Sequence, residues 1–169
     1  MAKQRHLKNA PIIEALIDIR VTLPSDIDIT TLKTIYPMIS KEYSAELELF
    51  QGAVTFQAAK PAETTGSFDK HGYRYTSLDK KRVLQVKRDG FTFSRLNPYE
   101  SWDKLYAEAF RLWELYASIA KPVSIKRIAV RYINRLEIPR ALFTDFAEYL
   151  TAPPIIPKAL PQGLSSYLI

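Results

Sequence analysis

The sequence contains no cysteine, which excludes disulfide bonds, thiolate metal sites and cysteine nucleophiles. Only five glycines and two histidines are present, and no glycine-rich phosphate loop, dinucleotide fingerprint, zinc-protease motif or serine-hydrolase motif occurs. No segment approaches the roughly 20 consecutive apolar residues of a membrane-spanning helix. We therefore predict no catalytic residue, no metal site and no cofactor, and we expect a soluble cytoplasmic protein without a membrane partner.

The composition is that of a globular protein with a modest positive charge. Of the 169 residues, 47% are hydrophobic and 25% are charged, which is enough apolar material for one domain of ordinary size. The net charge of +6 is compatible with an anionic ligand or a nucleic acid. A small excess of charge spread over a whole chain also serves solubility alone, so charge by itself selects no partner.

Hydrophobic patterns along the chain predict an α+β fold. Period-two alternation marks strands, and apolar residues at helical spacing mark helices. We expect strands at 11–23, 45–58 (as two short strands), 73–78, 82–88, 91–96 and 125–138, and helices at 32–43, 97–121 and 141–150. The polar segment 60–72 is predicted to be an exposed loop that leaves His71 in solvent. This order is typical of an antiparallel meander sheet with two or three helices packed on one face.

The clearest local signal is Asp89-Gly90, which lies between two β-rich runs and favours a type I′ turn because both residues tolerate positive φ. A turn at these residues sets Arg88 opposite Phe91 and Val86 opposite Phe93. Alternation then sends one set of side chains to the core and leaves the other on a polar face. The core set is Leu84, Val86 and Phe93, and the polar set is Gln85, Lys87, Thr92 and Ser94.

The long helix has a recognisable start and a broad aromatic face. Asn97 is the expected N-cap, Pro98 the first helical residue, and Glu100 completes a pair that resembles a capping box. We expect the Trp and Tyr residues that follow to lie in the core. They become a partner surface only if a second helix or subunit covers them.

Three arginines share one face of the strand at 125–138. Arg127, Arg131 and Arg135 occupy alternate positions, so their guanidinium groups project to the same side. In one interpretation they join Lys87 in a basic surface that binds phosphates or a carboxylate ligand. In the other, they pair across strands with acidic residues at the start of the chain, Glu14 and Asp18.

Four further residues are candidates for a binding site. Tyr73 and Tyr75 belong either to the core or to a polar sheet face on which they would stack with bases. Arg95 and Asn134 interrupt apolar faces and need a partner. They either line a pocket at the end of the sheet or cap and pair locally, in the case of Arg95 with Glu100 or Asp103.

Several segments together resemble a known family. They are 9–15 (NAPIIEA), 88–99 (RDGFTFSRLNPY) with Trp102, and 127–135 (RIAVRYINR). They resemble a sporadically distributed family of prokaryotic proteins of roughly 250 residues that has no assigned function. The resemblance implies a cytoplasmic prokaryotic protein and supplies no functional residue. It also implies a longer chain, so we expect residues 1–150 to be the α+β domain and 151–169 a proline-rich linker that leads into a further portion.

These observations leave three function classes open. The first is a non-enzymatic ligand- or partner-binding regulatory protein that acts through the polar face of its sheet, with a homodimer as one form. The second binds or processes nucleic acid with the arginine strand and Lys87. The third is an enzyme on a small anionic substrate that uses Arg95 and tyrosines. A large exposed apolar patch favours the first, an anion on the arginine face the second, and a deep pocket with convergent polar groups the third.

Overall fold

A computed structural model of the chain describes residues 10–56, 64–139 and 144–153, with the side chains at 45, 53–56 and 64–67 excepted. The chain divides into two compact units, Met1–Arg135 and Leu136–Ile169. The second unit contains one described helical turn, η3 (Phe146–Glu148), where Asp145 accepts a hydrogen bond from the Ala147 N–H. A helix over 141–150 was expected, but its residues 141–143 lie outside the described part.

The first unit contains a six-stranded antiparallel sheet, which confirms the α+β class. The strands follow one another in space in the order β2-β3-β4-β5-β1-β6. Four consecutive strands form the expected meander, and the N-terminal strand then lies between β5 and β6. The strands are β1 (Ile12–Thr22), β2 (Tyr43–Phe56), β3 (Thr64–Ser77), β4 (Arg82–Lys87), β5 (Gly90–Leu96) and β6 (Ser124–Asn134).

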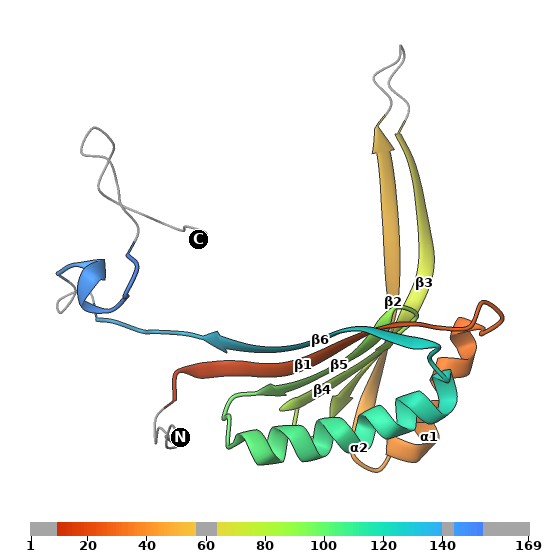
Figure 1. The fold of residues 1–169 in the computed structure, drawn as a ribbon, viewed down its shortest axis with the longest axis horizontal. Helices are drawn as coiled ribbons and strands as arrows, with labels where there is room; N and C mark the ends of the chain where they lie inside the picture. Colours follow the sequence, from red (N-terminus) through yellow and green to blue (C-terminus); the bar gives the residue numbers. More distant parts are fainter. Residues whose placement is uncertain (1–9, 57–63, 140–143, 154–169) are drawn as a thin grey trace. The chain divides into compact units, whose positions relative to one another are not determined.

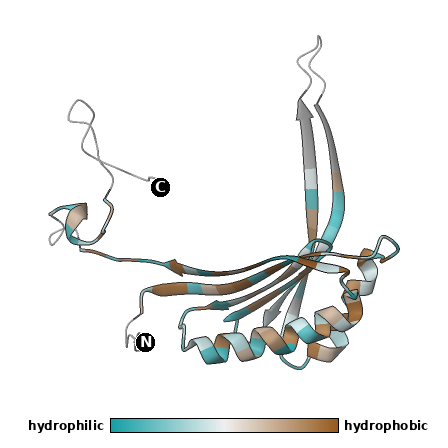
Figure 2. Cartoon of the chain, viewed as in Figure 1, coloured by the Kyte–Doolittle hydropathy of each residue, from teal (hydrophilic) through white to brown (hydrophobic). Residues whose placement is uncertain are grey.

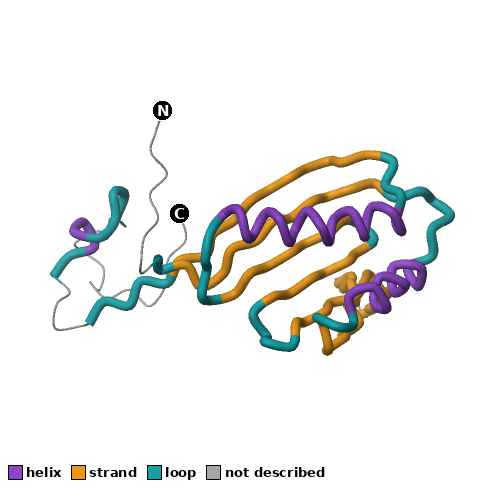
Figure 3. Tube along the Cα trace, turned by 90° about the horizontal axis from the view of Figure 1, so that it is seen from below, coloured by secondary structure: helices purple, strands orange, loops and turns teal. Residues whose placement is uncertain are grey.

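The helices cover one face of this sheet (Figures 1 and 3). They are η1 (Ile29–Ile35), α1 (Tyr36–Ile39) and α2 (Trp102–Ala120). Asp28 caps η1 as expected, because its carboxylate accepts the Thr30 N–H at 2.8 Å. A single core joins the helices to the sheet, and its fully buried side chains include Leu32, Tyr73, Tyr75, Leu84, Phe91, Phe93, Leu112 and Tyr116.

The long helix α2 packs against η1 and, on the sheet, against β5 and β1, and it begins later than expected. Ser101, not Asn97, is the N-cap, and its hydroxyl accepts the Lys104 N–H at 3.3 Å. The Asn97-Pro98 peptide bond is cis. Glu100 forms ion pairs with Arg95 and Lys104 and completes no capping box. The prediction failed because Ser101, a second good capping residue, follows closely in the sequence.

The β4–β5 hairpin turns at Arg88 and Asp89, so the predicted register was wrong by two positions. Lys87 lies opposite Gly90, and Val86 lies opposite Phe91. The glycine is required for a different reason than the one we inferred. A Cβ atom at Gly90 would lie 2.2 Å from the Ile19 carbonyl oxygen, so the glycine permits close contact with β1. A shift of two positions keeps every side chain on its predicted face, and Leu84, Val86 and Phe93 are buried.

The β2–β3 hairpin replaces two short strands and most of the expected loop. β2 is continuous from Tyr43 to Phe56, and β3 begins at Thr64. β4 pairs with β3 only from Gly72 to Thr76, so the outer parts of β2 and β3 pair with each other alone. Phe50 and Phe68 are exposed in this two-stranded part. The described side chains of this part form no buried face that would impose alternation, so the sequence pattern did not reveal the ribbon.

Candidate functional site

The polar face of the sheet is organised around one buried carboxylate, that of Asp18 in β1. Thr92 of β5 donates a hydrogen bond to its Oδ1 at 2.8 Å, and Arg127 of β6 donates to its Oδ2 at 2.7 Å. Lys87 donates to the Thr92 hydroxyl at 2.9 Å, and its ammonium lies 3.8 Å from Asp18. The arginine strand therefore shares its face with Lys87, as the first interpretation required.

The charges around Asp18 shift its pKa and that of Lys87. Burial raises the pKa of Asp18, but the bonds from Arg127 and Thr92 and the charges of Lys87 and Arg20 outweigh it, so the pKa is lowered. Burial lowers the pKa of Lys87, and Asp18 offsets this only in part. Three cations thus share one ionised carboxylate, because the Arg20 Nε also lies 3.4 Å from Asp18.

His71 belongs to this face and not to a solvated loop. It lies in β3, and its Nε2 is 2.8 Å from Oδ1 of Asp89, which also pairs with Arg20. Burial, together with the nearby charges of Lys87, Arg20 and Arg88, lowers the pKa of His71. The sequence interpretation missed this pair because the first part of β3, from Thr64 to Gly72, was predicted to be a loop.

The three arginines of the predicted stripe have different surroundings. Arg127 is bound to Asp18. Arg131 is exposed and makes no ion pair within the described ranges. Arg135 follows the end of β6, and its N–H donates to the Pro11 carbonyl at 2.8 Å. The pairing interpretation therefore holds for Arg127 with Asp18, and the stripe is neutralised at that end.

The other predicted binding residues lie away from the polar face. Tyr73 and Tyr75 are 1% and 0% exposed and stack on each other in the core, so the base-stacking interpretation is wrong. Their positions opposite Val86 and Leu84 explain this placement. Arg95 lies on the helix side of the sheet, 2.7 Å from Glu100. Asn134 is exposed at the last position of β6.

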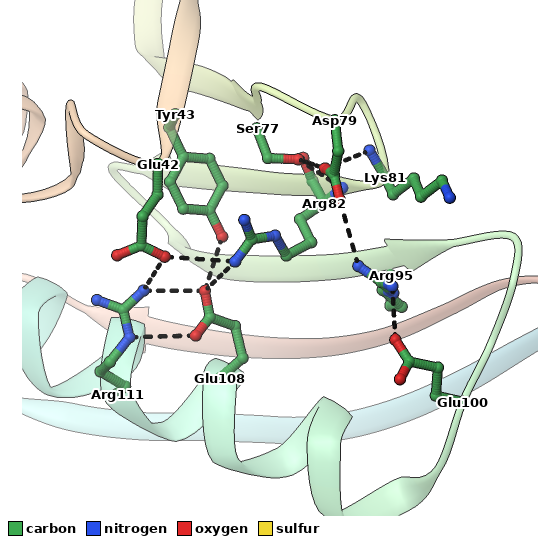
Figure 4. A network of polar contacts seen from close by, with 10 residues as sticks. All are labelled: Glu42, Tyr43, Ser77, Asp79, Lys81, Arg82, Arg95, Glu100, Glu108 and Arg111. Atoms are coloured by element: carbon green, nitrogen blue, oxygen red, sulfur yellow. Dashed lines mark hydrogen bonds and ion pairs between the residues drawn. The ribbon is translucent and has the colours of Figure 1, made fainter.

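Under α2, charged side chains form a network that ties the helix to the sheet (Figure 4). Glu108 accepts hydrogen bonds from Tyr43 at 3.1 Å, Arg82 at 3.2 Å and Arg111 at 2.9 Å. Burial raises the pKa of Glu108, but the bond and charge of Arg111 and the other donors outweigh it and lower the pKa. Arg111 also binds Glu42 at 3.1 Å. The network joins β2, β4 and α2 and has the character of a structural clamp.

Two polar cavities adjoin these clusters. A cavity of about 150 Å³ lies beside the clamp, lined in part by Arg82, Arg95, Glu100 and Lys104, and these four charges pair among themselves or with Glu108. An open cavity of about 590 Å³ lies at the His71 end, lined by Ile29, Gln51, Gly52, Asp69, Lys70, His71 and Arg88. Its lining mixes charges of both signs.

The least expected feature is an apolar groove between α2 and β6. Its volume is about 340 Å³, and Ile17 and Ile19 lie at its floor. One wall is a stripe on α2 at helical spacing, and the other is the apolar face of the edge strand. These walls consist of Trp102, Tyr106, Phe110 and Trp113 on α2 and of Ile125, Ile128 and Val130 on β6.

Several groove side chains are exposed to a degree unusual for their size. Ile128 is 63% exposed, Tyr106 49% and Phe110 47%. Hydrophobic segments are visible on both α2 and β6 in Figure 2. The Trp and Tyr residues of the long helix were expected in the core, and this is wrong for Tyr106. Alternation shows that a strand such as β6 has an apolar face but not whether a helix covers it. Here α2 lies over β5 and β1, and β6 extends beyond it.

The described part of the chain contains neither a cluster of metal ligands nor a helix that could span a membrane. No group of three or more His, Asp or Glu side chains there is arranged to hold a metal ion. No helix there has the length and apolarity needed to span a bilayer.

Comparisons with known proteins supply no relative. No protein-family model, no curated protein and no solved structure matches the chain. The family resemblance inferred from the sequence remains a prediction.

Proposed function

We propose that this chain is a non-enzymatic partner-binding protein whose docking surface is the apolar groove between α2 and β6. The observation that carries the proposal is the exposed apolar side chains on both walls of the groove, with Ile17 and Ile19 at its floor. Contiguous apolar surface rimmed by polar residues marks interaction sites in soluble proteins. Aromatic side chains in such a patch are the ones that contribute most to binding energy.

The polar face of the sheet supports a binding role less well. Its cations at Arg20, Lys87 and Arg127 converge on Asp18, and Arg20 also pairs with Asp89. A phosphate would have to compete with these carboxylates for the same donors. The partner-binding class that we favoured from the sequence therefore moves from the polar face to the helix face.

Site-specific labelling tests this proposal without knowledge of the partner. Hydroxyl radicals label exposed aromatic side chains, so the purified full chain at low concentration should be labelled at Tyr106 and Phe110. In an extract of the host cell, a docked macromolecule should protect these two residues. Phe68, which is 72% exposed on β3, is the internal control and should be labelled equally in both samples.

A substitution completes the test. Phe110→Lys should abolish the protection of Tyr106 in the extract and leave the unfolding midpoint of the purified chain nearly unchanged, because Phe110 is half-exposed. Equal labelling of Tyr106 in the dilute chain, in the concentrated chain and in the extract would refute the proposal.

A further inference from the structure

The groove ends at an open strand edge. β6 pairs with β1 alone, and no other described strand lies beside it. An unpaired edge next to an exposed apolar face is a template for strand addition. The edge and the groove therefore have to be considered as one surface.

The free edge carries the backbone groups of the apolar residues. On β1, the Ile19 carbonyl faces β5 and the Val21 N–H donates to Asp89, so odd-numbered residues are directed to β5. Even-numbered residues of β1 are then directed to β6, where Asp18 lies opposite Ala129. Antiparallel pairing alternates these directions along β6. The backbone groups that point to the open edge are therefore those of Ile128, Val130 and Tyr132.

We propose that a second copy of this chain pairs along β6 in antiparallel orientation, with Val130 opposite Val130 of the second copy. This inference rests on the proposed function, because it names the partner of the same groove. A two-fold interface must be complementary to itself, and β6 has this property around Val130. In that register Ile128 lies opposite Tyr132 of the second copy, so three consecutive facing pairs on the helix side are apolar.

Charge selects this register among its neighbours. A register centred on Ala129 would place Arg127 opposite Arg131 of the second copy, and one centred on Arg131 would place that arginine opposite itself. Like charges directly opposite each other destabilise a sheet. With Val130 at the centre, Arg131 faces Ala129 of the second copy and Arg127 faces Ile133. The arginines then occupy diagonal positions, where repulsion is weaker and solvent screens it.

The same symmetry joins the two grooves. A two-fold axis normal to the sheet keeps the α2 helices of both copies on the same side of the sheet. The apolar faces of the two β6 strands then form a shared floor between the two helices. Tyr106 and Phe110 of each copy line this combined space. Aromatic side chains of this size can fill the gap between helices that lie on either side of a central strand pair.

Light scattering and one pair of matched variants test the second copy. The full chain at about 100 µM, a concentration that populates a dimer of micromolar affinity, should have twice its 19.4 kDa mass. Val130→Lys places two ammonium groups at the two-fold axis, so this variant should have the mass of the monomer. Leu47→Lys is the control, because Leu47 is an exposed apolar residue on β2, the opposite edge strand, and this variant should remain dimeric. A single mass for the unsubstituted chain, or a dimer of Val130→Lys, would overturn the proposal.

Cysteine variants test the register, since the chain has no cysteine of its own. Facing residues of a hydrogen-bonded pair have Cα atoms about 5.5 Å apart, within reach of a disulfide. Val130→Cys should therefore form a covalent dimer on mild oxidation. The two copies of position 128 would be four residues apart along the strand, about 13 Å, so Ile128→Cys should not. A faster reaction of Ile128→Cys than of Val130→Cys would overturn the register.

The outcomes separate this inference from the proposed function. A monomeric chain whose Tyr106 is protected in the cell extract would refute the second copy and leave the docking groove intact. A monomeric chain with no protection would refute both.

Discussion

At the residue scale, single contacts explain why particular residue types occupy particular positions. Gly90 illustrates this, because the Asp89-Gly90 pair located a hairpin correctly but for a different physical reason than turn geometry. A glycine is required at this position because β1, a strand far away in the sequence, lies directly against it. A local pattern could indicate that a glycine matters here, but only the three-dimensional arrangement shows which backbone it contacts.

We expect Gly90→Ala to destabilise the fold by about 2–4 kcal/mol, since its Cβ would collide with backbone that cannot rotate away. The nearest atom is the Ile19 carbonyl oxygen, at 2.2 Å. Urea unfolding monitored by tryptophan fluorescence measures the loss. Gly52→Ala is the matched control, because its obstacle is the exposed ring of Phe68, which can move. Equal losses for the two variants would contradict the argument.

Asp18 gives a second prediction at this scale. Asp18→Asn should reduce the free energy of unfolding at pH 7 by about 1–3 kcal/mol, because three nearby cations lose their shared carboxylate.

The effect should depend on pH in a defined direction. The pKa of Asp18 is lower in the folded state than its ordinary value of 3.8. Its stabilising contribution is therefore complete above about pH 5 and is lost as the pH falls through the folded-state pKa. Urea titrations at several pH values should show the two proteins converging in acid. A difference that stays constant down to pH 2 would show that the carboxylate charge is not the cause.

At the element scale, the sequence predicted the type of each element better than the residues at which it begins and ends. The alternation in β1 and β6 and the helical spacing in α2 were sufficient to identify these elements. The start of α2 was wrong because several capping residues compete within a few positions. The outer part of β3 was predicted as a loop, because its described side chains form no buried face. The exposure of β6 could not be predicted, because it depends on which strands of the sheet α2 covers.

The corrected helix start leads to a prediction about capping. Ser101→Ala should destabilise the protein by about 1 kcal/mol, because the Lys104 N–H loses its acceptor. Asn97→Ala should change the stability by less than about 0.5 kcal/mol, because the Asn97 side chain is exposed and caps no helix. Thermal unfolding of both variants measures the difference. The reverse order of effects would restore Asn97 as the cap.

At the scale of the whole molecule, the two faces of the sheet have different characters. The polar face holds charges that largely satisfy one another, and the helix face ends in apolar surface that nothing in the described part of the chain covers. The sequence distinguished the two faces correctly. It could not show that the apolar one continues beyond its helix, because exposure is a property of the assembled layers.

If two copies associate, stability has to depend on protein concentration. Mass action stabilises the folded state whenever it binds a partner that the unfolded state does not. The Tm of the unsubstituted chain and of Leu47→Lys should therefore rise over a hundredfold increase in concentration. The Tm of Val130→Lys should not change. Calorimetry at several concentrations measures this, and identical behaviour of the three proteins would argue against the association.

The position of β1 in the sheet also has a consequence for synthesis. Among the described strands β1 is made first, yet its two neighbours, β5 and β6, are among the last segments of the unit to be made. The meander from β2 to β5 can form while β1 still has only one possible partner or none. Pairing at such sequence separation closes long loops and is slow. The apolar side chains of β1 therefore stay without a strand partner until β5 has been made, and unpaired strands of this kind are prone to aggregation during folding.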